Sequence, residues 1–236
     1  MAASPASCLA FLKQIGRLKV RYNMTLRSSA YCTVLPLVFI ECDRLTGSAR
    51  SFHYKRICIF IGYCEHLKRT GWVLRKVDEP ETVSGHMYRM AIMSFLFDDD
   101  DGVDRDRVMK MCLVHDMAES IVGDLTPHCG VSDEDKHQRE VAAIESFRSL
   151  VGQKAGTEMY DLFMEYEEQK TKEAKVVKDL DKFDMILQAF EYETDQERPG
   201  TLEEFFKSTE GKFTHPKIIK LIEQLYKERG EKLKSY

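Results

Sequence analysis

Residues 67–236 carry one amphipathic helical segment after another, and this periodicity constrains the fold more than any other feature of the sequence. Apolar side chains recur at three- and four-residue spacing, and Ser, Thr or Asp precedes several of the segments, as is typical of helix N-caps. The fold class is therefore predicted to be all-α. The expected helices begin after Thr82 or Ser84, after Ser132 and after Thr201, or cover 104–123, 157–169, 171–194 and 216–232.

The first 66 residues differ in composition from the rest of the chain. Residues 1–40 contain no Asp or Glu. Leu9–Leu18 is typical of an amphipathic helix, although an acid-free start with Arg and Ser also resembles a mitochondrial transit peptide. Two apolar runs, 34–40 and 57–61, are strand-length and far shorter than the roughly 20 residues that cross a bilayer. We therefore divide the chain into an N-terminal helix, an atypical insertion whose degree of order is left open, and a helical domain: 1–19, 20–66 and 67–236.

Charge and cysteine content narrow the class of protein. The net charge of −4, from 35 basic and 39 acidic residues, argues against a general nucleic-acid binder, which needs a basic excess for phosphate contacts. The seven Cys residues are odd in number, form no C-x-x-C pair and follow no signal peptide, so we expect reduced thiols. The sequence thus predicts a cytoplasmic protein with no nucleic-acid or membrane partner, and mitochondrial targeting is the alternative.

One imidazole and two carboxylates fall within five positions of the helix predicted over 104–123, directly after its apolar run 111–114. His115 and Glu119 are four residues apart and face the same way, whereas Asp116 projects about 100° round the helix. Burying such groups costs several kcal/mol unless each finds a partner. A His-Asp pair alone carries little weight, because about 0.5 are expected by chance at this composition. A bound cation explains the whole cluster, followed by Asp124, better than separate core contacts do.

Two further side chains are candidates for the same site. His86 lies near the start of the helix that precedes 104–123, and Asp181 lies in the apolar stripe of 171–194. Taken alone, Asp181 is explained equally well by a salt bridge to a lysine. The neighbouring charged residues are expected to face solvent: Lys178, Asp179, Lys182 and Asp184.

These residues carry a resemblance to a known family. The pattern His86, His115-Asp116 and Asp181 resembles that of the HD-domain superfamily of metal-dependent phosphohydrolases. The run 115–127, with Arg69–Trp72 and Glu81–Ser84, is similar to the 5′-deoxynucleotidases of the HD domain-containing protein 2 type. The resemblance covers about four fifths of the chain. It implies a compact α-helical bundle, formed by the first and third parts of the chain, that is usually a homodimer.

The resemblance also implies a metal site. It assigns one divalent metal to His86, His115, Asp116 and Asp181. Two imidazoles and two carboxylates leave positions open on an octahedral ion, which suits Mn²⁺, Co²⁺ or Fe²⁺, whereas Mg²⁺ prefers oxygen ligands. The family further suggests a second cation at Glu119, Asp124 and the Leu125 carbonyl. Otherwise Glu119 acts through a bound water as general base or acid.

Arg69 and Trp72 are the candidates for substrate binding. A guanidinium can meet a phosphate with two parallel hydrogen bonds, and the alternative for Arg69 is an ordinary surface charge. For Trp72, the single Trp of the chain, the resemblance implies packing against the sugar, where its bulk leaves no room for a 2′-hydroxyl. The alternative for Trp72 is core packing.

The chain departs from the family pattern in two places. The residue before the first metal-binding His is usually acidic, but Gly85 stands here, so a carboxylate that could orient His86 is lost. The segment 20–66 has no recognised counterpart.

We therefore predict a metal-dependent enzyme that converts deoxyribonucleoside 5′-monophosphates to deoxyribonucleosides and phosphate, by direct attack of water on phosphorus. The expected cofactor is Mn²⁺, Co²⁺ or Mg²⁺, with one or two ions per chain. One alternative is an HD phosphohydrolase that acts on a cyclic nucleotide or a nucleoside triphosphate. The other is a homologue that binds nucleotide or metal with impaired catalysis.

Overall fold

The computed structural model of the chain describes residues 62–235. Within this range there are helices and turns but no β-strand, and one isolated bridge pairs Lys68 with Thr82. The predicted all-α class is therefore confirmed. The expected N-terminal helix and the two strand-length apolar runs lie outside the described residues, and the division of the chain at residues 19 and 66 stays a prediction.

Residues 62–66 are helical, and further helices of different lengths follow along the chain. No helix in the described part of the chain combines the length and the apolar character that crossing a membrane requires. Short 3₁₀ turns separate some of the helices: η2 (Ser94–Leu96), η3 (Asp99–Asp101) and η4 (Pro127–Cys129). The α-helices are α4 (Thr70–Leu74), α5 (Val83–Met93), α6 (Arg105–Val114), α7 (Glu119–Val122), α8 (Asp133–Val151), α9 (Gln153–Glu168), α10 (Lys172–Asp195), α11 (Glu203–Thr209) and α12 (Pro216–Leu233).

Several helices begin at the capping residues that the sequence predicts. The side chains of Thr82, Asp104, Ser132 and Thr171 each accept a hydrogen bond from the backbone N–H three residues further on. These residues open α5, α6, α8 and α10. Each bond satisfies one of the backbone donors that a helix N-terminus leaves without an intrahelical partner.

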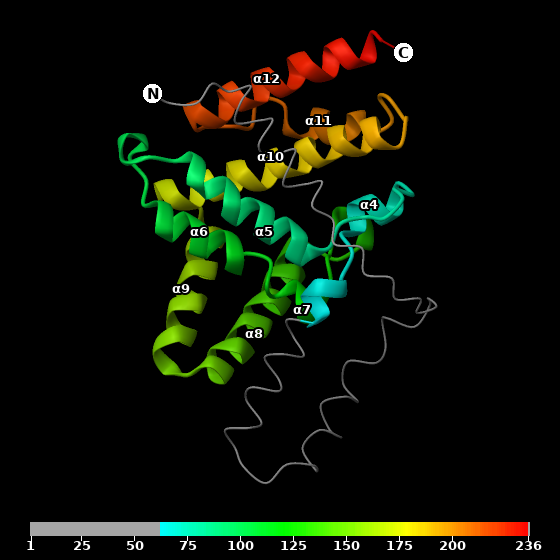
Figure 1. Cartoon of the computed structure of the whole chain (residues 1–236). Helices are drawn as coiled ribbons and strands as arrows, with labels where there is room; N and C mark the ends of the chain where they lie inside the picture. The colour runs from blue at the N-terminus through cyan, green and yellow to red at the C-terminus, as the bar shows by residue number, and fades with distance from the viewer. Residues whose placement is uncertain (1–61, 236) are drawn as a thin grey trace.

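The long helix α10 runs through the middle of the bundle (Figure 1). It packs against α5, α6 and α9, and also against α11 and α12. Leu180, Phe183, Ile186 and Leu187 have no exposed surface, so α10 is the centre of the hydrophobic core. The helices α8 and α9 pack on each other and meet at Gly152, whose φ of 92° is a conformation that favours glycine.

The segment before α4 lies against the start of α5. Cys64 is buried beside Val83, and the Leu67 carbonyl accepts a hydrogen bond from the Val83 N–H at 2.9 Å. The Arg69 N–H donates to the Glu81 carbonyl at 3.1 Å. This pairing holds Arg69 next to the first turn of the helix that carries the first candidate metal ligand.

The helix predicted over 104–123 is interrupted, which corrects the sequence analysis. The helix α6 ends at Val114, and a turn precedes α7. In that turn the backbone hydrogen bonds join residues three apart, as from the Glu119 N–H to the Asp116 carbonyl at 3.1 Å. The His115 ring lies 2.9 Å from the Cys112 carbonyl, the acceptor that the Asp116 N–H would use in a continued α-helix. A side chain has thus taken the place of a backbone donor.

Candidate metal centre

His86 lies on the buried face of α5 with its side chain fully enclosed. Its Nδ1 atom lies 2.7 Å from Oδ2 of Asp184 on α10. Because an ionised carboxylate can only accept, Nδ1 must carry a proton, and Nε2 of the neutral ring is left with its lone pair. Nε2 lies 3.2 Å from Oδ1 of Asp181 and 3.7 Å from Oδ2 of Asp116. In the neutral ring the lone pair of His86 Nε2 therefore faces oxygens of two carboxylates with no proton between them.

His115, in the turn after α6, is oriented in a similar way. Its Nδ1 atom lies 2.9 Å from the Cys112 carbonyl oxygen, which can only accept, so Nδ1 is again the protonated nitrogen. Its Nε2 atom lies 3.2 Å from Oδ2 of Asp116. The two imidazole rings have centroids 5.5 Å apart. Asp116 consequently has one oxygen near the Nε2 atoms of both histidines.

The arrangement fits one divalent cation. The Nε2 atoms of His86 and His115 are buried, and within the described residues neither has a satisfactory hydrogen-bond partner. One ligand atom from each of His86, His115 and Asp116 lies within 4.8 Å of the others, and Asp181 adjoins His86. Two nitrogen lone pairs and two carboxylates are a donor set for an intermediate transition metal such as Mn²⁺ or Co²⁺.

The pKa values of two carboxylates and one imidazole in the site are shifted by burial and by one another's charge. Burial would raise the pKa of Asp116, but His115 and His86 hold it below the ordinary range. Burial likewise opposes ionisation of Asp181, whereas Lys178 and His86 hold its pKa well below the usual value. Burial and Arg69 would lower the pKa of His86, but its hydrogen-bonded carboxylates raise it to about 9. A proton and a metal cation would therefore compete for the same lone pair.

Glu119, Asp124 and Leu125 lie along and just beyond α7. Glu119 is buried, and burial together with Asp116 and Asp124 raises its pKa well above that of an ordinary carboxyl group. Asp124 is tied to α4, because its Oδ2 atom accepts from the Thr70 N–H at 2.6 Å and its carbonyl accepts from the Thr70 hydroxyl at 2.8 Å. Leu125 is half-buried. Their roles as ligands of a second cation stay predictions.

Arg69 and Trp72 share one carboxylate partner. Arg69 Nε lies 3.7 Å from Oε1 of Glu81, and the same oxygen accepts from Trp72 Nε1 at 3.2 Å. Although burial opposes it, the pKa of Arg69 is raised by Glu81 and by the site carboxylates, Asp181 first among them. The guanidinium therefore lies in the electric field of the candidate metal centre. Trp72 is 1% exposed, and its ring packs against Tyr192 and Phe205.

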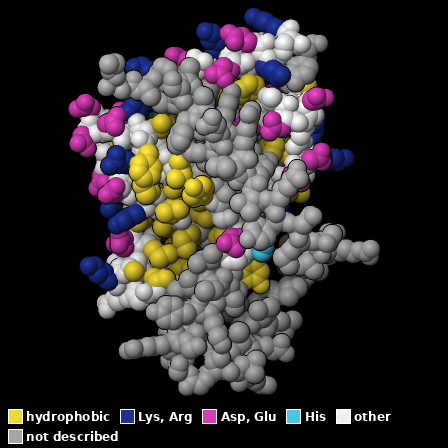
Figure 2. Space-filling view, viewed as in Figure 1, with side chains coloured by type: hydrophobic (Ala, Val, Ile, Leu, Met, Phe, Trp, Pro, Cys, Tyr) yellow, Lys and Arg dark blue, Asp and Glu magenta, His cyan; other side chains and the backbone are white. Residues whose placement is uncertain are grey.

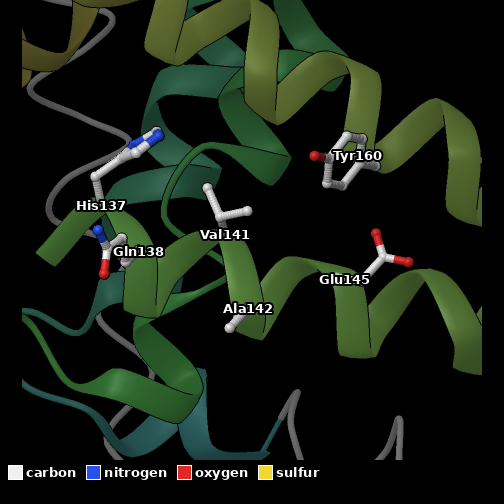
Figure 3. A pocket seen from close by; sticks show the side chains of 6 residues that line it. All are labelled: His137, Gln138, Val141, Ala142, Glu145 and Tyr160. Atoms are coloured by element: carbon white, nitrogen blue, oxygen red, sulfur yellow. The ribbon is translucent and has the colours of Figure 1, made fainter. Parts of the chain in front are cut away.

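The groove in Figure 3 lies elsewhere, between α8 and α9. It encloses about 490 Å³ and contains none of the predicted site residues. The candidate metal centre is thus separate from this groove. The residues that line it are His137, Gln138, Val141, Ala142, Glu145 and Tyr160.

The HD domain family matches residues 62–219. The chain belongs to the HD domain family. It is 49% identical over 170 residues to 5′-deoxynucleotidase HDDC2 of Xenopus laevis, covering 72% of this chain and 84% of the relative. It is 46% identical over 186 residues to the mouse protein of that name, covering 79% of this chain and 93% of the relative. The resemblance found in the sequence is therefore confirmed.

Solved structures support the same assignment. A protein from Pyrococcus horikoshii superposes with a TM-score of 0.58 at 28% identity, covering 74% of this chain and 96% of its own. A predicted metal-dependent phosphohydrolase from Magnetospirillum magnetotacticum superposes with a TM-score of 0.53 at 25% identity, covering 80% of this chain and 93% of its own. The predicted HD-domain bundle is thus the observed fold.

Two acidic residues of this HD domain were wrongly expected to face solvent. Asp184 is fully buried against His86, and Asp179 is 1% exposed. Asp179 accepts hydrogen bonds from the N–H groups of Thr214 and His215, and so caps the loop before α12. The reason is that α10 is buried on nearly all sides, so the helical period does not separate core from surface positions. The one sequence signal for the burial of Asp184 is His86, a buried imidazole that needs a hydrogen-bond partner.

The remaining expectations for α10 are more nearly correct. Lys178 is exposed, whereas Lys182 is half-buried. Asp181 makes the salt bridge to a lysine and also lies in the candidate metal centre, since Oδ2 accepts from Lys178 Nζ at 3.1 Å while Oδ1 lies toward His86. Tyr166 also donates to Oδ2, at 2.9 Å, and sequence reasoning did not find this contact.

Gly85 lies in the first turn of α5. Its N–H donates to the Thr82 side chain at 3.2 Å, so it serves the N-cap of α5. A carboxylate does contact the His86 ring, but it comes from Asp184 on α10, whose Oδ2 atom lies 2.7 Å from Nδ1.

Proposed function

We propose that this chain is a metal-dependent 5′-deoxynucleotidase, which hydrolyses deoxyribonucleoside 5′-monophosphates to deoxyribonucleosides and phosphate. Its HD domain relatives carry that activity in their names. The observation that supports the proposal most directly is the meeting of two buried imidazole lone pairs with the carboxylates of Asp116 and Asp181. Such a donor set serves a divalent cation far better than it serves the stability of a core.

The proposed ligands of this cation are His86, His115, Asp116 and Asp181, and the proposed ion is Mn²⁺, Co²⁺ or Mg²⁺. When bound, the ion supplies positive charge to a phosphate and makes water a better nucleophile at neutral pH. A second cation at Glu119, Asp124 and the Leu125 carbonyl belongs to the same proposal.

The other site residues would handle the phosphate and a proton. Arg69, which is already in the field of the site carboxylates, would bind two phosphate oxygens. As water attacks, the bond from phosphorus to the 5′-oxygen breaks, and that oxygen takes up a proton. In the alternative without that second cation, Glu119 is suited to deliver it through a bound water, because burial and neighbouring carboxylates raise its pKa, so the group retains a proton that it regains from the attacking water. The negative charge of Asp124, which Thr70 holds in place, would help to keep the pKa of Glu119 raised.

Selection of the sugar is assigned to Trp72. The indole is fixed by its bond to Glu81 and by two aromatic neighbours, so it cannot easily move aside. A rigid bulky group beside C2′ would reject a ribonucleotide by steric conflict.

We further propose that the protein is cytoplasmic and forms a homodimer. Figure 2 shows apolar side chains gathered over the face that α5 and α6 present in this view. Tyr88, Phe95 and Leu113 are 58%, 57% and 45% exposed. Exposed apolar residues of this kind are suited to contact between protein chains. Light scattering would test the mass of the particle in solution.

A phosphate-release assay tests the function. The protein is treated with a chelator, dialysed and supplied with Mn²⁺, Co²⁺ or Mg²⁺, together with one nucleotide at a time. We expect release from deoxyribonucleoside 5′-monophosphates, weaker release from ribonucleoside 5′-monophosphates, and none without metal. Preferential hydrolysis of a cyclic nucleotide or a nucleoside triphosphate would instead support the other HD phosphohydrolase activity. Metal binding with no hydrolysis of any substrate would support a binding homologue.

A further inference from the structure

The carboxylate of Asp184 uses both of its oxygens inside the core. Oδ2 accepts from His86 Nδ1 at 2.7 Å, and Oδ1 accepts from Arg89 Nε at 2.6 Å. Asp184 has no exposed surface, and Arg89 is 6% exposed. Arg89 follows His86 by three residues on α5, and Asp184 follows Asp181 by three residues on α10. Each helix therefore contributes one candidate metal ligand and, one turn later, one member of this ion pair.

We propose that Asp184, held by Arg89, is the positioning residue for His86. A carboxylate on Nδ1 fixes the rotation of the imidazole ring and keeps the proton on that nitrogen, so the lone pair of Nε2 stays directed toward Asp181 and Asp116. Arg89 prevents the carboxylate from rotating away and balances its charge. The proposal rests on the metal-dependent function given above, and it assigns to α10 the role expected of an acidic residue at position 85.

The surroundings of Arg89 support a positioning role. Its Nη1 atom donates to Oε2 of Glu191 at 2.9 Å, so the guanidinium is held from a second side by α10. Hydrogen bonds to two carboxylates from one helix leave the guanidinium little freedom to turn. A buried ion pair is in general weak evidence for stability, because desolvation offsets the attraction. Contact with a metal ligand gives this pair a reason to be present that stability alone does not.

The same helix provides a matched control. Glu193 on α10 accepts from Nε and Nη2 of Arg229 at 2.8 and 3.0 Å, and both residues are buried. This pair has the same chemistry and burial as Asp184 with Arg89. It bonds to the start of α11, through the Leu202 N–H, and not to a candidate metal ligand. A purely structural contribution should therefore be similar for both pairs.

The test compares Asp184→Asn with Glu193→Gln in the full chain. Titration calorimetry with Mn²⁺ alone gives the dissociation constant, and circular dichroism gives the folded fraction. We expect Asp184→Asn to raise the Kd for Mn²⁺ by about 10–100-fold, which is typical when the partner of a ligating histidine is lost. Glu193→Gln should lower Tm and leave the Kd within about twofold of the parent value, because it touches no ligand.

A second readout is independent of hydrolysis. Nitrogen NMR of the metal-free protein at a pH above about 9, where the His86 ring is neutral, reports which ring nitrogen is protonated, and we expect Asp184→Asn to replace the single Nδ1–H form with a mixture. At saturating Mn²⁺, Asp184→Asn should regain most of its kcat with little change in KM. An unchanged Kd for Mn²⁺ and an unchanged His86 signal would overturn the proposal.

Further outcomes separate this proposal from the proposed function. If Asp184→Asn does not fold, Arg89→Lys is measured in its place, because lysine keeps the positive charge but cannot make the hydrogen bond from Nε. An unchanged Mn²⁺ affinity in Arg89→Lys also overturns the positioning role. A parent protein that binds Mn²⁺ but hydrolyses no deoxynucleotide contradicts only the proposed function. A parent protein that binds no divalent ion overturns both.

Discussion

Replacing Asp116 should remove the response of the fold to metal. One oxygen of this residue lies 3.2 Å from Nε2 of His115 and 3.7 Å from Nε2 of His86, so a single carboxylate joins the two candidate nitrogen ligands. In Asp116→Ala the remaining ligands lose the group that lies between them. We expect the affinity for Mn²⁺ to fall at least about 100-fold, the upper end of the range for loss of a supporting group, because here a ligand itself is lost.

The size of the effect follows from binding linkage. Mn²⁺ at about 100 times its Kd stabilises the folded protein by about 2.7 kcal/mol. Each kcal/mol raises Tm by about 2–4 °C in a domain of this size, so the parent protein should gain about 5–11 °C. At the same Mn²⁺ concentration a variant with a 100-fold weaker site gains only about 0.4 kcal/mol, or about 1–2 °C.

The metal-free protein must be measured as well. The pKa of Asp116 is lowered in the folded protein, because His115 and His86 outweigh burial, so its ionised form stabilises the fold above the ordinary carboxyl pKa and this stability is lost as the pH falls. Asp116→Ala will therefore also lower the metal-free Tm at neutral pH. The deciding quantity is the shift caused by Mn²⁺, not Tm itself.

Differential scanning fluorimetry with and without Mn²⁺ measures this shift, and elemental analysis and dCMP hydrolysis accompany it. Asp179→Asn is the control, because Asp179 is a buried, hydrogen-bonded carboxylate that caps the loop before α12. The control should lose stability and keep the full Mn²⁺ shift. An Asp116→Ala protein that keeps its metal content, its thermal shift and its turnover would refute the assignment of this site.

The other predictions concern different parts of the molecule. Trp72→Phe should narrow the gap in kcat/KM between deoxyribo- and ribonucleoside monophosphates, whereas Trp72→Ala would also cost about 3–5 kcal/mol through a core cavity; an unchanged ratio in the folded Phe variant returns the residue to a packing role. Arg69→Ala should lower kcat/KM by about 10–100-fold through loss of a charge-assisted bond to phosphate, with metal content unchanged. Burial raises the pKa of Glu191 to about 7, so the protonated group contributes stability below pH 4.5. That contribution is lost as the pH rises from 4.5 to about 7, and Glu191→Gln should flatten the decline in the free energy of unfolding measured in denaturant melts. Joining Lys19 directly to Gly62, which keeps the helix 62–66 and the buried Cys64, should leave a folded protein that hydrolyses deoxynucleotides and aggregates less, because loop closure costs little. Failure to fold would make 20–61 part of the domain.

The sequence reveals those parts of the fold that depend on local chemistry. Thr82, one of two predicted caps with Ser84, and Ser132 are the caps that the sequence predicts, because a hydroxyl before an apolar-periodic segment satisfies a helix N-terminus. Thr171, predicted as the first residue of its helix, is the cap of α10. The interruption after Val114 was missed, because it depends on a ring nitrogen of His115 taking a backbone acceptor. A helical period cannot indicate such an exchange.

The candidate site shows the same limit from another side. The four proposed ligands were found through their residue types and the family pattern. Asp184 was not, because its sequence neighbourhood of mixed charges resembles an exposed helix face. What distinguishes Asp184 is the partner on α5, His86, 98 positions earlier in the chain. Only the packing of α10 against α5 brings the two together.

That packing explains why a polar centre can exist inside an apolar core. Met90 on α5 and Phe183 and Leu187 on α10 have no exposed surface, so the helices are held together by close-packed side chains around the polar groups. Burial of the ionised carboxylates of Asp116 and Asp181 has a desolvation cost, which His115, His86 and Lys178 reduce and the apolar burial around the site offsets. The same rigid packing fixes the distance between His86 and Asp181, because neither α5 nor α10 can shift within a dense core. A cation that neutralises these carboxylates thus acts on a site that the core has already shaped, and metal affinity becomes a property of how α5 and α10 pack.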